Sequence, residues 1–449
     1  MFMFFRLNAL FIIFSSIFIV IASIFISNHF ILRVNQRDIM AGALRNVVVV
    51  GGSYVGVATA KELASILPPT HRVLLVEPHS HFHHLFAFPR FAILPSHEHK
   101  AFIPYSSLFP PTSPHKVIQA RAVSLQPNAL TLDRPYLDSS SSTTLPFDYL
   151  IAATGTTLSF PGTMTSDSKS ASVTSLQSFQ SSIKASPSII IIGGGAVGVQ
   201  MACDLKEIYP SKSVTLVHSR DQLMPVYHPA LSDLIKDRFR ELGVNLVTGS
   251  RVVLPPAGFP TVYDPEQGKE EEQQQQVHLQ NGQTLKAGLV IQATGQKPNN
   301  AFIKTLEDVP LNDKNGFVRV KKTMQFSDTK KYGHLFAVGD INDCGAHKAA
   351  KPGAVQAGVA ARNVVKMIES RAQGKEDDGL RLEELSVQPA GIHMTLGLKK
   401  HVLFRNPNAA QGDTEPFIQI KDDGTEDMDI EKVWVRRGVT VTKPQDYHL

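Results

Sequence analysis

Apolar residues occur in short, unbroken runs along the chain, and the clearest runs are followed by segments with helical spacing. The run Val47–Val50 precedes a helical pattern over 56–67, and the run Ile189–Ile192 precedes one over 196–208. A continuous apolar run of this length is typical of a parallel strand that is buried on both faces. The pattern therefore predicts two βαβ units.

The same periodicities predict the remaining elements. A helix over 229–242 is expected to end at Gly243, because glycine is favoured at helix C-caps. The Ser139–Ser142 run and the low-complexity tract Glu270–Gln276 are predicted to be hairpin tips, the second one disordered. Further predictions are strands at 73–76, 117–133, 145–152, 213–218, 289–295 and 334–340, a helix over 353–368, and short strands and loops over 385–449.

Each of the two main strands ends in a glycine-rich loop. The first loop contains Gly51, Gly52, Ser53 and Gly56, and the second contains Gly193, Gly195 and Gly198. Glycines in this position let the backbone approach a pyrophosphate, and the helix that follows adds N–H donors and a partial positive charge. Ser53 replaces the usual middle glycine but is small enough to fit. Two such loops predict two bound dinucleotides, a flavin and a nicotinamide.

The two glycine loops differ in the residue that ends the second strand of each unit. Glu77 ends the second strand of the first unit, where a carboxylate can bind the hydroxyls of a ribose. His218, followed by Ser219 and Arg220, takes that position in the second unit. A His-Ser-Arg cluster can pair with a 2′-phosphate, so we expect NADPH to be used at least as well as NADH.

Small-residue turns end three further strands. Thr154 and Gly155 end one, Gly295 ends its counterpart in the second unit, and Gly339-Asp340 follows the strand at 334–338. An aspartate before a helix can bind the ribityl hydroxyls of FAD while the helix N-terminus faces the flavin. The predicted cofactors are thus FAD and NAD(P)H.

These patterns define an α/β fold with two Rossmann-like dinucleotide-binding domains, one inserted in the other. A small C-terminal α+β region and an N-terminal hydrophobic helix complete the prediction. The expected divisions are an anchor helix at 7–32, an FAD-binding domain at 45–180 and 298–370, an NAD(P)H-binding domain at 186–297, and a C-terminal domain at 385–449.

The segment 7–32 contains no charged residue and is long enough to span a bilayer. Arg6 precedes it, and Arg33 and Arg37 follow it, which favours a cytosolic catalytic part. A chain that starts at Met40 would lack the segment and be soluble. The mitochondrial outer membrane, the lipid droplet and the endoplasmic reticulum are the alternatives for the organelle, and the oligomeric state stays open.

The composition argues against several classes of protein. Cys203 and Cys344 are the two cysteines of the chain, so a redox-active Cys-x-x-Cys pair is absent, as is a disulfide scaffold. A net charge of +5 with no basic run interleaved with aromatics gives no reason to expect specific nucleic-acid binding. The histidines between 79 and 99 lack cysteines nearby and acids apart from Glu98, so we expect no metal site.

From about residue 45 to the end, the sequence resembles the ferroptosis-suppressor-protein family of flavoproteins. The resemblance is carried by Val76-Glu77-Pro78, His81-Phe82-His83-His84, the Ala-Thr-Gly turns, Val214–Ser219 and Val338-Gly339-Asp340. It implies NAD(P)H-dependent reduction of quinones, including membrane ubiquinone, through bound FAD.

The resemblance also implies roles for further residues. Arg90 and the backbone near Ala122 would contact FAD, and Lys351 matches a lysine near the flavin, although its local spacing differs. Gln200 stands where the family keeps a glutamate near the nicotinamide; Asp204, one helical turn later, is a candidate to compensate. Gln200 and Lys351 are thus the predicted catalytic residues.

Two alternative functions are also compatible with the sequence. A type II NADH dehydrogenase or a ferredoxin-type reductase would share the architecture and differ in the electron acceptor. A non-enzymatic alternative is a redox-responsive signalling or cell-death factor that carries a structural flavin.

Overall fold

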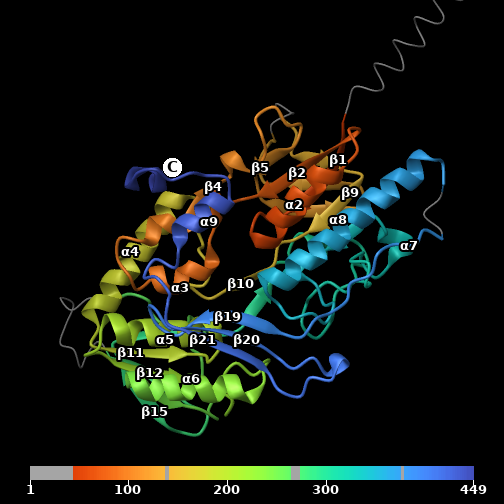
Figure 1. The fold of residues 1–449 in the computed structure, drawn as a ribbon. Helices are drawn as coiled ribbons and strands as arrows, with labels where there is room; N and C mark the ends of the chain where they lie inside the picture. The colour runs from red at the N-terminus through yellow and green to blue at the C-terminus, as the bar shows by residue number, and fades with distance from the viewer. Residues whose placement is uncertain (1–43, 137–140, 264–273, 376–378) are drawn as a thin grey trace, which may run out of the picture.

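The computed structural model describes residues 44–136, 141–263, 274–375 and 379–449 (Figure 1). The predicted membrane helix at 7–32 lies outside these residues, as do parts of both predicted hairpin tips. In the described ranges, no helix is long and apolar enough to cross a membrane.

A five-stranded parallel sheet forms the first half of the fold. In order across the sheet the strands are β18 (Leu335–Ala337), β9 (Tyr149–Ala152), β1 (Arg45–Val50), β2 (His71–Glu77) and β5 (Lys116–Gln119). The central strand β1 lies between β2 and β9, and Val50 is in register with Val76 on one side and Ala152 on the other.

Both faces of this sheet are buried, which explains the unbroken apolar run of β1. Val47 and Val49 belong to one hydrophobic cluster, and Val48 and Val50 belong to another on the opposite face. Helices α2 (Tyr54–Ile66) and α8 (Ala350–Ala372) pack together over the first face (Figure 1). The second face packs against an antiparallel sheet of β6 (Ala122–Gln126), β7 (Ala129–Leu132) and β8 (Thr144–Pro146).

A four-stranded parallel sheet forms the second half. Ile189 and Ile191 face the cluster that contains α5 (Ala196–Ile208) and α6 (Pro229–Leu242), whereas Ile190 and Ile192 face a separate cluster under a hairpin. The strands are, in order, β13 (Asn245–Val247), β12 (Ser213–Val217), β11 (Ser188–Ile192) and β16 (Leu289–Gln292).

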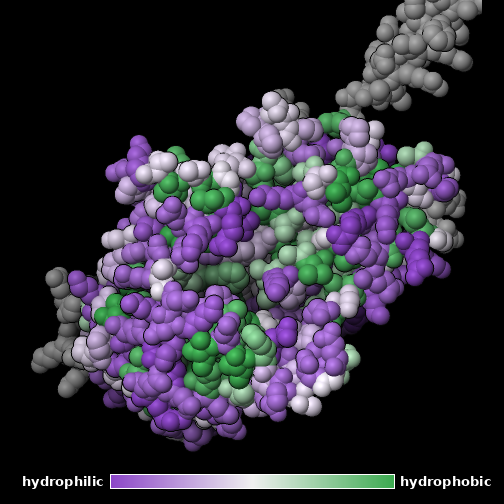
Figure 2. Space-filling view, in the orientation of Figure 1, coloured by the Kyte–Doolittle hydropathy of each residue, from purple (hydrophilic) through white to green (hydrophobic). Residues whose placement is uncertain are grey.

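The chain enters and leaves the second sheet through paired connections. Strand β10 (Thr156–Leu158) runs antiparallel to β17 (Gln296–Pro298), and β18 returns to the first sheet afterwards. The second sheet is therefore inserted between strands of the first, as predicted. The surface is hollowed between the two halves (Figure 2).

The remaining elements pack around these sheets. Strand β3 (His81–His83) pairs with β4 (Phe102–Pro104), with α3 (Phe88–Phe91) between them, and α7 (Thr329–Tyr332) is a single turn. The C-terminal part contains the antiparallel sheet β19 (Gly391–Thr395), β20 (His401–Arg405) and β21 (Phe417–Lys421), followed by helix α9 (Ile430–Arg436).

Three parts of the structure differ from the sequence predictions. Helix α4 (Lys169–Ala185) was not predicted, and neither was α9. Gln275 and Gln276 are not in a hairpin tip: they begin strand β14 (Gln275–His278), which pairs with β15 (Thr284–Ala287), and Gly282 lies in the turn between them. Helix α6 does end at Gly243, which has the left-handed conformation expected of a glycine C-cap.

Candidate cofactor-binding site

The first glycine loop joins β1 to α2 and depends on glycine at both ends. Gly51 has φ +102°, and a Cβ there would lie 2.6 Å from the carbonyl oxygen of Ala153. A Cβ on Gly56 would lie 1.7 Å from the carbonyl oxygen of Gly51. The first glycine thus permits the turn, and the last permits close packing of helix on strand.

The second loop repeats this geometry between β11 and α5. Gly193 has φ +120° and lies against Ala293, and a Cβ on Gly198 would lie 2.0 Å from the carbonyl oxygen of Gly193. Gly195 differs, because its φ is −85° and a Cβ there would meet no atom within 4 Å. That glycine faces open space rather than the protein.

Both loops leave helix N-termini uncapped by side chains. The N-cap residues Ser53 and Gly195 make no side-chain cap. The N–H groups of the first turn of α2 and of α5 can therefore bind an anion. The two loops fit the pyrophosphate groups of two dinucleotides.

Glu77 and His218 occupy equivalent positions at the strand ends. The N–H of Gly52 donates to Oε2 of Glu77 at 2.5 Å, and the N–H of Gly194 donates to Nδ1 of His218 at 3.1 Å. Burial lowers the pKa of His218, so its ring is neutral at pH 7. Its ring also lies within hydrogen-bonding reach of the backbone of Gln222, which partly opposes the effect of burial on this pKa. Arg220, nearby, is exposed.

Several residues beside the first loop were not predicted from sequence. The hydroxyl of Tyr105 donates to the carbonyl of Gly52 at 2.7 Å. The guanidinium of Arg437, from the segment after α9, lies 3.8 Å from the ring centre of Phe82 and 5.6 Å from that of Tyr54. Burial lowers the pKa of Arg437. No sequence pattern linked these residues, because Arg437 is far from the loop along the chain.

Asp340 lies in a turn that buried amides hold in place. Gly339 has φ +76°, and its N–H donates to Oε1 of Gln356 at 2.8 Å; Nδ2 of Asn342 donates to the same oxygen at 2.6 Å. Burial raises the pKa of Asp340. Within the described residues, no donor is hydrogen-bonded to its carboxylate. An acceptor of this kind fits a ligand that offers hydroxyl groups.

Lys348, rather than Lys351, is the lysine next to this turn. Nζ of Lys348 donates to the carbonyl oxygens of Asp340 at 3.0 Å and Asn342 at 2.7 Å. Lys351 lies exposed in the first turn of α8. The predicted catalytic role of Lys351 therefore stays a prediction, and Lys348 is the lysine that contacts the Asp340 turn.

The two Ala-Thr-Gly turns precede β10 and β17, which run antiparallel and so place the turns at opposite ends of the pair. Gly155 and Gly295 have φ +59° and +61°. Oγ1 of Thr154 donates to the carbonyl of Asn299 at 2.8 Å, and Nδ2 of Asn299 donates back to the carbonyl of Thr154 at 2.9 Å. These bonds fasten the first turn to the segment that follows β17.

Arg90 has a different environment from the one that the resemblance implied. Its side chain is 1% exposed and forms an ion pair with Asp204, with Nη2 and Oδ1 2.9 Å apart. The guanidinium also donates to backbone carbonyls, those of Gly397, Leu398, Thr425 and Glu426. Its donors are thus used within the protein, which does not support a contact with FAD. Asp204 is fully buried in the same pair, so it is not free to compensate for Gln200.

The last two predicted residues lie at the edges of the site. Nε2 of Gln200 donates to Oγ1 of Thr395, on β19, at 2.9 Å. Ala122 begins β6 and pairs with Leu132. Ala120, two positions before Ala122, is hydrogen-bonded to the end of β2: its backbone N–H donates to the carbonyl of Glu77 at 3.1 Å.

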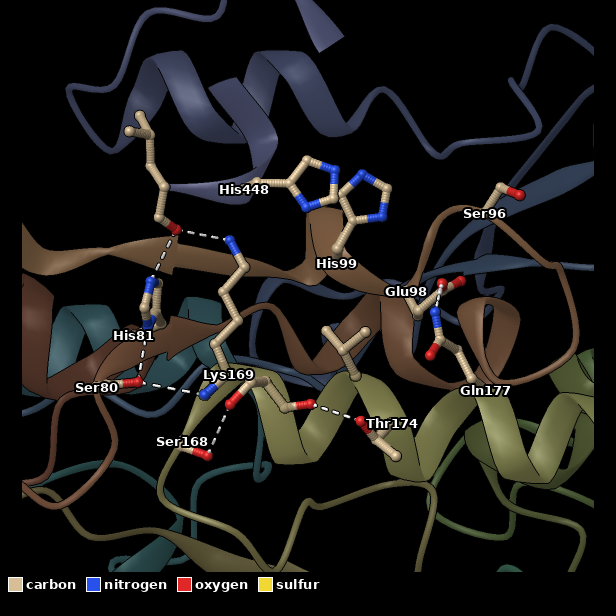
Figure 3. Close-up of a pocket in the computed structure, with 13 residues that line it drawn as sticks. Ser80, His81, Ser96, Glu98, His99, Ser168, Lys169, Thr174, Gln177 and His448 are labelled. Atoms are coloured by element: carbon tan, nitrogen blue, oxygen red, sulfur yellow. Dashed lines mark hydrogen bonds between the residues drawn. The ribbon is translucent and has the colours of Figure 1, made fainter. Parts of the chain in front are cut away.

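A cavity of about 790 Å³ lies between the start of α4 and the C-terminal residues (Figure 3). Nζ of Lys169 donates to the backbone oxygens of Tyr447 and Leu449, each at 2.7 Å, and the rings of His99 and His448 stack 4.3 Å apart. No predicted site residue lines this cavity. Its polar groups mainly fasten the C-terminal segment to the first half.

The described parts of the chain give no support for a metal site or a disulfide. No group of three or more His, Cys, Asp or Glu residues is arranged to hold a metal ion there. Cys203 is buried, Cys344 is half-buried, and neither forms a disulfide.

Two glycine loops, each between a parallel strand and a helix and each with a polar strand end, define a two-dinucleotide flavoprotein. Residues 41–362 match the pyridine nucleotide-disulphide oxidoreductase family. The chain belongs to that family and is an oxidoreductase that uses FAD and NAD(P)H.

Individual relatives agree with this assignment. The chain is 32% identical over 413 residues to Fe-regulated protein 8 of Mycosarcoma maydis, covering 88% of this chain and 96% of that protein. It is 29% identical over 342 residues to ferroptosis suppressor protein 1 of Mus musculus, covering 75% and 84%. The sulfide:quinone oxidoreductase of Aquifex aeolicus has a similar fold, with a TM-score of 0.63 at 19% identity, covering 84% and 87%.

Proposed function

We propose that this protein is an NAD(P)H:quinone oxidoreductase. In this proposal FAD stays in the domain formed by 45–180 and 298–370, NAD(P)H exchanges at 186–297, and 385–449 forms a C-terminal domain. The observation that carries the proposal is a pair of nucleotide loops without a dithiol. Cys203 is fully buried, burial raises its pKa, and both cysteines are free. Electrons therefore pass to an external acceptor rather than to a protein disulfide.

The chain's own residues bind and orient the cofactors. The first glycine loop, Glu77 and Asp340 would hold FAD, which when bound would supply the chemistry that joins hydride transfer from NAD(P)H to electron transfer to the quinone. Glu77 and Asp340 offer carboxylates to ribose and ribityl hydroxyls, and Lys348 holds the Asp340 turn and adds a positive charge beside it. Gln200, which cannot titrate, orients the region near the nicotinamide through Thr395.

An acceptor panel on protein that lacks residues 1–40 tests the reaction. We expect yellow protein that oxidises NAD(P)H rapidly with a short-chain quinone. Flavin-bound protein with negligible turnover would favour a redox-responsive factor instead, and turnover with other acceptors but not with quinones would favour a different reductase. Asp340→Ala should lower FAD content, whereas Asp313→Ala, at an exposed ion pair, should not.

The second strand end supports use of NADPH. Arg220 is exposed, has no recorded ion pair among the described residues, and can pair with a 2′-phosphate. Arg220→Ala should lower kcat/KM for NADPH while leaving that for NADH nearly unchanged. A hundredfold preference of the unaltered protein for NADH would contradict this part of the proposal.

We also propose that residues 7–32 anchor the enzyme where its quinone is dissolved. Protein with and without residues 1–40 should then differ in sedimentation with liposomes and in turnover of a long-chain quinone, while turnover of a short-chain quinone stays equal. Equal behaviour with both quinones would remove the anchor from the proposal.

A further inference from the structure

One cation beside the first glycine loop has no anionic partner. Within the described residues, the guanidinium of Arg437 makes neither an ion pair nor a hydrogen bond; its contacts are with the rings of Phe82 and Tyr54. The residue is only partly exposed, and an arginine cannot lose its proton in a protein. A cation that is taken out of water without an opposite charge is unfavourable, so a ligand that supplies the charge would be bound there.

The groups around Arg437 are neutral or positive. Burial raises the pKa of Tyr54 and Tyr105, so both hydroxyls are protonated at pH 7. Burial and then the charge of Arg437 lower the pKa of His84 to about 3, which keeps that ring neutral. Desolvation and then Arg437 lower the pKa of Lys61, on α2, which is a second cation. None of these side chains compensates the charge of Arg437.

The C-terminal part holds Arg437 in this place. Trp434, three residues earlier in α9, is fully buried, and its Nε1 donates to the carbonyl of Lys100 at 2.8 Å. The N–H of Arg437 donates to the carbonyl of Trp434 at 2.9 Å. Gly438 follows with φ +83°, and a Cβ there would lie 3.2 Å from the carbonyl oxygen of Ser107. Arg437 thus lies between a buried anchor and a tight turn.

Two tyrosines connect Arg437 to the loop itself. Tyr54, whose ring centre lies 5.6 Å from the guanidinium, is the first residue of α2. Tyr105 donates to the carbonyl of Gly52 and is close enough to Arg437 for each to affect the pKa of the other. Glu77, the carboxylate beside the loop, accepts from the N–H of Gly52 and is not paired with Arg437. Arg437 therefore lies next to the helix N-terminus that fits a pyrophosphate.

We propose that Arg437 binds a phosphate of FAD, so that the C-terminal part completes the flavin site. The inference goes beyond quinone reduction and rests on one part of the proposed function, the placement of FAD at the first loop. Guanidinium donors match phosphate oxygens, and charge-assisted hydrogen bonds are roughly twice as strong as neutral ones. Stacking on Phe82 uses the face of the guanidinium and leaves its N–H donors, which lie in the plane, for the ligand.

Two adjacent arginines provide a matched pair of variants. Arg437→Gln and Arg436→Gln each remove one positive charge from the same segment, but Arg436 is exposed. Arg437→Gln should raise the Kd for FAD about tenfold or more, release FAD faster from the purified holoprotein and weaken the dependence of Kd on salt. Arg436→Gln should leave all three nearly unchanged, and Arg437→Lys should recover part of the affinity. Flavin fluorescence measures both binding and release.

Thermal unfolding separates binding from a role in folding. In flavin-free protein Arg437 is an unpaired cation near Lys61 and Arg436, so Arg437→Gln should leave the thermal midpoint unchanged or raise it. At a fixed FAD concentration, the midpoint should rise less in this variant than in the unaltered protein. A flavin-free variant that unfolds at a lower temperature, or does not fold, would show that the side chain serves the fold, and would overturn the inference.

The remaining outcomes distinguish this inference from the flavin site as a whole. An unchanged Kd for FAD in Arg437→Gln, or equal effects of the Arg436 and Arg437 substitutions, would also overturn it. If Glu77→Ala lowers the FAD content while Arg437→Gln does not, the role of Arg437 alone is lost. If neither variant lowers it, FAD is not bound at the first loop, and that part of the proposed function is lost as well.

Discussion

Gly193 and Gly195, in the second nucleotide loop, are under different structural constraints. Gly193 has a φ that disfavours other residues and lies against the carbonyl of Ala293, so the protein itself requires it. Gly195 has an ordinary φ and an open side, so only a ligand would require it. The same motif therefore contains one glycine that the fold requires and one that the fold alone does not require.

Alanine substitutions at the two positions should have different effects on stability and on cofactor affinity. Gly193→Ala should destabilise the fold by about 2 kcal/mol or more, because of its positive φ and the close carbonyl. Gly195→Ala should keep the thermal midpoint and raise the Kd for NAD(P)H about tenfold or more, because the added methyl group occupies space that the pyrophosphate needs. Thermal unfolding and titration of the cofactor measure both. Unchanged affinity in Gly195→Ala would argue against nucleotide binding there.

At the scale of elements, α3 and α5 connect the two halves through Arg90 and Asp204. The pair is almost fully buried, and loss of one partner leaves an unpaired charge in the interior. Arg90→Met should therefore lower the free energy of unfolding by about 3–5 kcal/mol, and the double variant Arg90→Met/Asp204→Leu should recover much of it.

The same variants test the earlier expectation for Arg90. If this residue contacts FAD, the stable double variant should lose the flavin. If its role is to join α3 to α5, the double variant should retain flavin. Denaturant titration and the absorbance ratio of flavin to protein give the two readouts.

Elements with strong local patterns were predictable from the sequence. Strands β1 and β11 are continuous apolar runs, and α6 combines helical spacing with Gly243. Helix α4 was missed because serines occupy four of its exposed positions and two of its six buried ones, which weakens the apolar stripe. Contacts such as Arg90–Asp204 join residues more than one hundred positions apart, and no local pattern encodes them.

At the scale of the whole molecule, many histidines are held neutral. Among the described residues, burial lowers the pKa of nine of them, to about 3 for His84 and about 4 for His99. The nine are His71, His81, His83, His84, His99, His115, His218, His347 and His393.

These shifts predict that acid destabilises the fold. The unfolded chain takes up protons near pH 6.5, whereas the folded chain resists them, so stability is complete above about pH 6.5 and falls as pH drops through the lower folded values. Each such histidine contributes a slope of at most about 1.4 kcal/mol per pH unit. Denaturant unfolding between pH 8 and 4 measures the slope. His84→Gln should make it shallower; an identical slope would exclude His84 as a contributor.

The late return of β18 to the first sheet affects the order of assembly during synthesis. Strand β9 is translated well before its partner β18, and the whole second sheet is made in between. A nascent chain can thus complete its nicotinamide half while the edge of β9 is still open, and an open edge invites wrong pairing. Asp340 emerges later still. If Asp340 holds FAD as proposed, flavin capture is among the last events in maturation, and we expect chains that stop before residue 340 to aggregate or be degraded rather than to be partly active.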